Sequence, residues 1–147
     1  MKHLTLIDKA FLLKRTAPFS TLDLDLLLTI ADKLGLVVFD PGDYIFVTQE
    51  EANRMYFIVK GQVHIQGPHK QHFYTLESGD FFGEESLFNN KPRSYAAFTP
   101  IETHVLTLSR TNLYTIISEC PSVAVGFLQV YTTAHPLRPF KSMEIEK

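Results

Sequence analysis

The sequence has little cysteine, no dense run of positive charge and no long apolar run. Cys120 is the single cysteine among 147 residues, so an intrachain disulfide framework and a cysteine-rich zinc site are excluded. Lysine and arginine number 14 against 16 acidic residues and do not cluster, so the electrostatic footprint of a nucleic-acid-binding protein is missing. Charges interrupt every apolar run before the ~20 residues that a membrane-spanning helix needs. We therefore expect a cytoplasmic protein without a nucleic-acid or membrane partner.

The composition is that of an ordinary globular protein, with 45% hydrophobic and 20% charged residues. Neither an internal linker nor a repeat is present, so residues 1–147 are predicted to form one domain. Its expected parts are a barrel over about 36–109, C-terminal helices over about 110–135 and a tail over 136–147.

A helix is predicted before Gly35, because apolar residues recur there at helical spacing. Ser20 is its expected N-cap, with Asp23 in the capping-box position. A shorter helix is expected around Phe11. The apolar residues of the longer helix are Leu22, Leu26, Ile30 and Leu34.

From Leu36 the pattern changes to short runs of β-branched and aromatic residues separated by turn signals such as Asp40-Pro41-Gly42. Regularly spaced short strands with tight turns predict a mainly β fold with flanking helices, built as an antiparallel sandwich, jelly roll or barrel. After the strands the helical pattern returns, and Pro121 is expected to begin the second of two helices. The expected runs are LVVF, YIFVTQ, MYFIVK, QVHIQ and HFYTL, followed by Ser94 to Thr99 and His104 to Leu108.

One segment, FGEESLFNNKPR, interrupts the strands and carries the chemistry. Gly83 permits a close backbone turn, and Glu84 to Phe88 predict a short helix whose first N–H groups are free to bind an anion. Arg93 follows at the expected start of a strand, where its guanidinium can fork onto phosphate oxygens. The carboxylate of Glu84 then suits sugar hydroxyls. The segment therefore predicts a grip on a sugar phosphate.

LESGDFFGEESLFNNKPRSYAA resembles the phosphate-binding cassette of cyclic-nucleotide-binding domains, the module of the bacterial catabolite activator and of the protein kinase A regulatory subunit. DPGDYIFVTQEEANRMYFIVKGQVHI is similar to the first barrel hairpins of that family, and LSRTNLYTIISECPSVAVGFL to the helices after the barrel. The resemblance implies a jelly-roll-like barrel with N-terminal helices, a cassette helix and two C-terminal helices. It also implies a sensor of cAMP or cGMP that signals through those last helices to a protein effector or a homodimer.

The resemblance further implies ligand contacts. Glu84 is expected to bind the ribose 2′-hydroxyl, the backbone N–H of Ser86 to meet the cyclic phosphate, and Arg93 to pair with that phosphate. The implied ligand-binding residues are Gly83, Glu84, Glu85, Ser86, Arg93 and Ser94.

Two residues depart from the family pattern. Glu85 stands where the family has an aliphatic residue, and Tyr95 where it has a small alanine, so that the tyrosine ring is placed to crowd or plug the pocket. The alternative hypothesis is therefore a family member that has lost its ligand and serves in protein interaction or dimerisation. Candidates for the contact with the base are Tyr131, Arg138 and Phe140.

Catalysis is not predicted. The strand-region histidines include no His-x-His pair with a following glutamate of the kind that would hold a metal in a jelly roll, so neither a metal nor a resident cofactor is expected. Cys120 has no readable base partner, and the adjacent carboxylates Glu84 and Glu85 should diverge rather than converge on one substrate atom. The histidines in question are His64, His69, His72 and His104.

Overall fold

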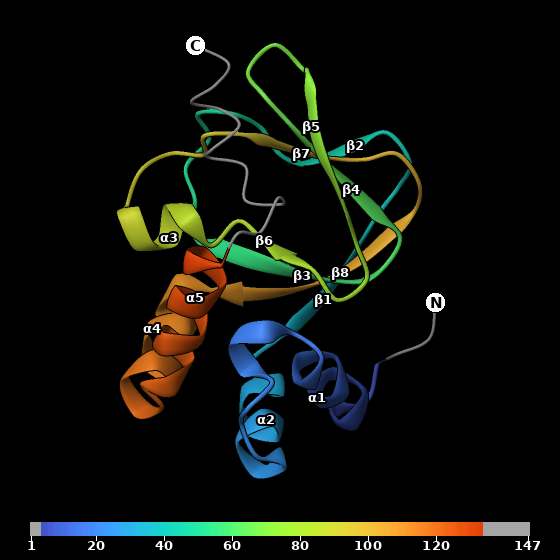
Figure 1. The fold of residues 1–147 in the computed structure, drawn as a ribbon. Coiled ribbons are helices and arrows are strands. Elements are labelled where there is room, and N and C mark those ends of the chain that lie inside the picture. The colour runs from blue at the N-terminus through green and yellow to red at the C-terminus, as the bar shows by residue number, and fades with distance from the viewer. Residues whose placement is uncertain (1–3, 134–147) are drawn as a thin grey trace.

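The computed structural model describes residues 4–133 and has the expected mainly β architecture with flanking helices (Figure 1). Helical elements precede and follow the strands, and one short helix interrupts them. The helical elements are α1 (Leu6–Lys14), a 3-10 turn η1 (Ala17–Phe19), α2 (Leu24–Ala31), α3 (Glu85–Asn89), α4 (Arg110–Glu119) and α5 (Ser122–Thr132). The strands are β1 (Gly35–Phe39), β2 (Asp43–Phe46), β3 (Arg54–Lys60), β4 (Gln62–Gln66), β5 (His72–Glu77), β6 (Phe81–Phe82), β7 (Ala96–Thr99) and β8 (Thr103–Ser109).

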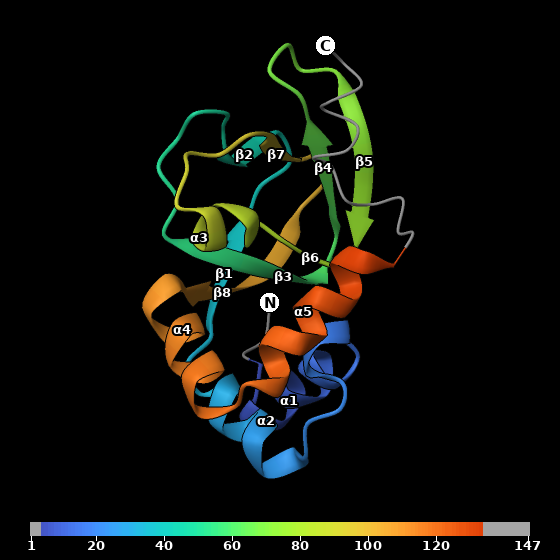
Figure 2. The same cartoon turned by 60° about the vertical axis from the view of Figure 1, so that its left-hand side comes forward.

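Within the described residues the strands form two four-stranded sheets of jelly-roll type. The first sheet has the order β1-β8-β3-β6 and the second has the order β2-β7-β4-β5. Every strand pair is antiparallel. Figures 1 and 2 show α1, α2, α4 and α5 gathered on one side of the barrel, with α3 beside the barrel near α5.

The first sheet is buried on both faces, and β3 shows why. Met55 and Phe57 of β3 point into the core that the sheet shares with the helices. Tyr56 and Ile58, the alternating residues, point into the core between the two sheets. The strand therefore reads as a continuous apolar run, whereas a strand with one wet face would alternate.

The helix before the barrel is shorter than predicted. Its N-cap is Asp23, whose carboxylate accepts a hydrogen bond from the N–H of Leu26 at 3.0 Å. Ser20 does not cap it, because the Ser20 hydroxyl donates to the carbonyl of Ala17 within η1. The helix ends at Ala31, and Gly35 is the first residue of β1 rather than the residue that stops the helix.

The C-terminal helices begin where the sequence predicted. Ser109 caps α4 through the N–H of Asn112, and α5 begins directly after Pro121. The expected tail over 136–147 and the candidate base contacts Arg138 and Phe140 lie outside the described residues. Among described helices no single one has the length and apolarity to span a bilayer; only α4 and α5 taken together, bent by 108°, pass on length and composition.

The strand expected over Ser94 to Thr99 begins two positions late, at Ala96. Arg93 does not open that strand, because its backbone pairs with the loop between β2 and β3. Its N–H donates to the carbonyl of Glu50 at 2.8 Å, and its carbonyl accepts from the N–H of Gln49 at 2.7 Å. These two bonds fix the backbone of Arg93 beside the cassette.

Candidate ligand-binding site

The cassette is a tight turn followed by the short helix α3. Gly83 has a φ of +87°, a conformation that side chains rarely adopt. A Cβ at this position would lie 3.1 Å from Nη1 of Arg93 and 3.3 Å from Cδ2 of Tyr56. Glycine therefore serves two needs here, the turn and the close approach of the arginine.

Arg93 lies beneath this turn and is only 3% exposed. Its Nη1 donates to the carbonyl of Gly83 at 2.5 Å, and its Nη2 donates to the carbonyl of Arg54 at 2.6 Å. The guanidinium carbon stands 4.0 Å from the centre of the Phe46 ring, a cation–π distance. Burial lowers the pKa of this guanidinium, although the nearby Tyr95, Tyr56 and two glutamates oppose that shift.

Tyr95 fills the space beside Arg93 and is 3% exposed. Its hydroxyl accepts a hydrogen bond from the N–H of Gly83 at 2.9 Å and donates to Oε1 of Glu85 at 2.8 Å. The ring packs against Phe46 with 5.6 Å between ring centres. Burial, reinforced by the negative charges of Glu85 and Glu84, raises the pKa of the Tyr95 hydroxyl well above its usual 10.0.

Glu84 is fully buried and connects the cassette to the last helix. Its Oε2 accepts a hydrogen bond from the hydroxyl of Tyr131 in α5 at 2.9 Å. Phe88 of α3 contacts Phe127 of α5 edge to face, with 5.2 Å between ring centres. Glu84 and Glu85 thus diverge onto two different tyrosines, and α5 lies against the cassette.

Of the remaining predicted site residues, Glu85 and Ser94 line a cavity, and Ser86 does not. Ser86 is buried, and its hydroxyl donates to the carbonyl of Pro92, whereas Ser94 is exposed. A cavity of about 350 Å³ lies beside the cassette, and Arg93 is not in its wall. The lining residues are Glu85, Phe88, Asn89, Ser94, Tyr95 and Tyr131.

Comparison with known proteins places this arrangement in a family. The family model described as "Cyclic nucleotide-binding domain" matches residues 36–120, which include the barrel, the cassette and α4. The chain belongs to the cyclic nucleotide-binding domain family. The resemblance inferred from the cassette and the barrel hairpins is confirmed.

The relatives of this chain include different kinds of protein, such as a channel and a transcriptional regulator. The chain is 31% identical over 116 residues to a cyclic nucleotide-gated channel of Caenorhabditis elegans, covering 74% of this chain and 16% of the channel. It is 28% identical over 123 residues to the CRP-like cAMP-activated global transcriptional regulator of Mycobacterium tuberculosis, covering 81% of this chain and 55% of the regulator. This chain thus spans about half or less of these two relatives.

The fold agrees with solved structures of the family. The regulatory subunit of a cAMP-independent protein kinase A from Trypanosoma brucei superposes with a TM-score of 0.77 at 24% identity, covering 94% of this chain and 50% of that one. This likeness establishes the jelly-roll fold.

Three of the predicted ligand-binding residues lie close together in the structure. Gly83, Glu84 and Arg93 meet around one turn, but the terminal nitrogens of Arg93 point to backbone carbonyls. Sequence reasoning missed Phe46 and the carbonyl of Arg54, which hold the guanidinium from the end of β2 and the start of β3. No sequence signal marks such contacts, because they join residues far apart in the chain.

Proposed function

We propose that this domain is a regulatory module that works without a cyclic nucleotide, through contact with a protein partner or a second copy of the chain. The observation that carries the proposal is Tyr95. Its hydroxyl accepts a hydrogen bond from the N–H of Gly83, three residues before Ser86, whose N–H is expected from the family resemblance to meet the cyclic phosphate. Its ring packs on Phe46 beside Arg93. The side chain thus substitutes for the ligand that this turn is expected to hold.

The energetic cost of removing Tyr95 from this space argues against nucleotide binding. Burying an aromatic side chain removes roughly 150–250 Å² from water, which is worth roughly 4–6 kcal/mol. The two hydrogen bonds of the hydroxyl add roughly 1 kcal/mol each. Since every 1.4 kcal/mol is about a factor of ten, a total cost of roughly 6–8 kcal/mol would weaken a micromolar site to about 10 mM or beyond.

Arg93 supports the same interpretation. Both terminal nitrogens already donate to backbone carbonyls, and the guanidinium lies on the Phe46 ring. A bound phosphate would have to compete with contacts that also hold the turn at Gly83 and the first residue of β3. We infer that Arg93 has a structural role in this chain.

Binding of cAMP or cGMP is the second candidate function, and one observation favours it. Nε of Arg93 is buried without a hydrogen-bond partner among the described residues, and an unsatisfied donor of this kind is what an anion would satisfy. In that case the ligand would displace Tyr95 and signal through the C-terminal helices. Its contacts would be Gly83, Glu84, Glu85, Ser86, Arg93 and Ser94.

Isothermal titration separates the two candidates. The wild-type protein is titrated with cAMP and with cGMP, and we expect no binding heat up to about 1 mM, because the displacement of Tyr95 is so costly. Tyr95→Ala, which restores the small residue that the family has at this position, shows whether the ring is the obstacle. Tyr44→Ala, which removes a tyrosine that packs on Phe98 in the second sheet, is the matched control.

A dissociation constant of the wild type below about 100 μM for either nucleotide would contradict the proposal and establish the second candidate. We propose no catalytic activity for the domain, and a cytoplasmic location stays a prediction.

A further inference from the structure

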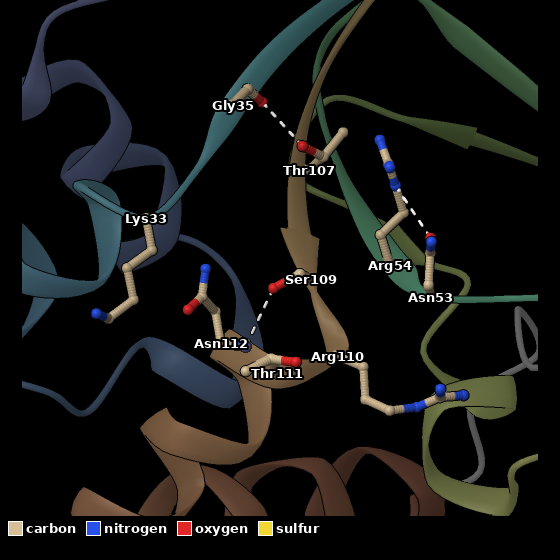
Figure 3. A pocket seen from close by; sticks show the side chains of 9 residues that line it. All are labelled: Lys33, Gly35, Asn53, Arg54, Thr107, Ser109, Arg110, Thr111 and Asn112. Carbon is tan, nitrogen blue, oxygen red and sulfur yellow. Dashed lines mark hydrogen bonds between the residues drawn. The ribbon is translucent and has the colours of Figure 1, made fainter.

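A groove of about 540 Å³ lies at the end of the first sheet, where five elements meet. Lys33 follows α2, Gly35 begins β1, Arg54 begins β3, Ser109 ends β8 and Arg110 begins α4. Figure 3 shows the groove, which differs in its residues from the cavity beside the cassette. The lining residues are Lys33, Gly35, Asn53, Arg54, Thr107, Ser109, Arg110, Thr111 and Asn112.

All charged residues that line this groove are positively charged. Three of its nine lining residues are cationic and none is acidic, although acidic residues outnumber lysine and arginine, 16 to 14, in the whole chain. Within residues 4–133 the one ion pair joins His104 to Glu102, so Lys33, Arg54 and Arg110 have no carboxylate within 4.0 Å there. A positive groove without internal counter-charges attracts an anionic partner.

The placement of the cations decides what kind of anion fits. Figure 3 shows Lys33 and Arg54 on opposite sides of the groove, and the Arg110 side chain turned away from Lys33. The Arg110 guanidinium already donates to the carbonyl of Ser86. An extended chain with several carboxylates therefore suits the two sides of the groove, because it can offer one carboxylate to Lys33 and another to Arg54.

The wall between the two cations suits a peptide. Asn112 offers an amide group, and Thr107 and Thr111 offer hydroxyls, which can bond to backbone N–H and C=O groups of an extended segment. Asn53 lies beyond Arg54, and its Oδ1 accepts a hydrogen bond from Nε of Arg54 at 3.2 Å. The three cations of this groove stand among six uncharged lining residues and do not form the continuous basic stripe that would track a nucleic-acid backbone. We propose that this groove binds an acidic, extended segment of a partner protein, with Lys33 and Arg54 receiving its carboxylates.

This inference rests on the proposed function, because it names the chemistry of the protein partner. The two proposals nevertheless fail separately. Nucleotide titration tests the role of Tyr95 in the cassette. A peptide titration uses no nucleotide and measures chemical shifts of residues at the end of the first sheet.

The test is a titration of the isotopically labelled full chain with a hexaglutamate peptide, followed by amide chemical shifts. We expect the largest shifts at Gly35, Thr107, Thr111 and Asn112, and we expect them to fade as salt rises to about 0.5 M, since exposed ion pairs are screened. The double variant Lys33→Gln/Arg54→Gln should weaken binding at least about tenfold, because both pairs are lost.

The matched control is Lys60→Gln/Lys91→Gln, which removes the same charge from exposed positions outside the groove and should bind like the wild type. Lys60 and Arg54 are the two ends of β3, roughly 20 Å apart. Equal weakening in both double variants would mean that only net charge matters, and it would overturn the proposal.

Two further probes decide the class of ligand. Inorganic phosphate producing the same shifts with equal affinity would make this a small-anion site, and a single-stranded oligonucleotide binding more tightly than hexaglutamate would make it a nucleic-acid site. Either result contradicts the acidic-segment proposal. Uncharged hexaglutamine should leave the four amides unmoved.

Discussion

At the scale of single residues, Tyr95 and Arg93 carry the interpretation of this domain. The hydroxyl of Tyr95 satisfies the N–H of Gly83, and the guanidinium of Arg93 satisfies the carbonyl of the same residue. Both polar groups of one backbone position are thus paired by side chains in a buried site, where an unpaired group would cost about 1–3 kcal/mol. A ligand that displaced either side chain would have to replace these bonds.

The buried Tyr95 hydroxyl makes the stability of the domain sensitive to alkaline pH. Burial holds the pKa of this hydroxyl well above 10.0 in the folded protein, while the unfolded chain titrates near the usual value. Below about pH 10 both states keep the proton, and the contribution of Tyr95 is fully present. Above about pH 10 the unfolded state binds fewer protons, so the free energy of unfolding falls as pH rises, by at most about 1.4 kcal/mol per pH unit.

Urea unfolding of the wild type and of Tyr95→Phe, measured from about pH 8 to 11, checks this prediction. The variant is less stable at neutral pH, because the N–H of Gly83 loses its partner, but its stability should fall less steeply above pH ~10. Tyr56 also has a pKa raised by burial and is present in both proteins, so its effect cancels. Parallel pH profiles would show that Tyr95 does not keep its proton in the folded state.

At the scale of elements, the sequence predicted what depends on local patterns. The hairpin β3–β4 and the strand β8 follow from short runs of β-branched and aromatic residues bounded by turn residues close in the chain. The predicted start of α2 was wrong. The Ser20 hydroxyl donates to the carbonyl of Ala17, and Asp23 is the N-cap of the helix instead. The two-residue strand β6 is too short to give a periodic signal.

In the cassette, too, the sequence predicted the local features and missed the contacts between residues that are distant in the chain. Its residues, its glycine turn and its short helix were predicted from the motif, since they are adjacent in sequence. The direction of the Arg93 guanidinium was not, because it depends on Phe46 and on the carbonyl of Arg54, which reach the site through the fold of the barrel. The hydrogen bond between Tyr131 and Glu84 likewise joins α5 to the cassette across a sequence separation of 47 residues.

The packing of α5 on η1 depends on the absence of a side chain at Gly126. A Cβ there would lie 2.7 Å from the carbonyl oxygen and 2.8 Å from Cα of Pro18, both backbone atoms. Alanine is the better helix former by about 1 kcal/mol, yet overpacking against backbone costs about 1–3 kcal/mol. We expect Gly126→Ala to lower the free energy of unfolding by about 1–2 kcal/mol in urea unfolding.

The neighbouring exposed position provides the control. Val125 is 51% exposed, so Val125→Ala should change stability by no more than about 0.5 kcal/mol. A Gly126→Ala protein as stable as the wild type would mean that α5 does not sit against Pro18.

At the scale of the whole molecule, the two apolar cores share one sheet. Met55 and Phe57 belong to the core under the helices, and Tyr56 and Ile58 to the core inside the barrel. Because β3 has one backbone, loosening either core moves the wall of the other. The domain should therefore unfold as one cooperative unit, as small single domains usually do.

Phe127 offers the sharpest test of that coupling, because its ring joins the N-terminal turn, the barrel and the cassette. It is 2% exposed, and its ring centre lies 6.1 Å from that of Phe19, 5.5 Å from Phe81 and 5.2 Å from Phe88. Phe127→Ala should cost about 3–5 kcal/mol, a large part of a total that is about 5–15 kcal/mol for domains of this kind. Leu128→Ala, the next residue and 60% exposed, should cost less than about 0.5 kcal/mol.

Native-state hydrogen exchange shows whether Phe127→Ala destabilises both cores or only the helices around position 127. If the cores are coupled through β3, the amides of Val63 and Ile65, which lie in the barrel and do not touch Phe127, lose as much protection as those of α5. Loss confined to α5 and α3 would instead show that the helices open while the barrel stays folded. The cassette helix would then open together with α5, to which it is joined by the hydrogen bond of Tyr131 to Glu84 and by the contact of Phe88 with Phe127.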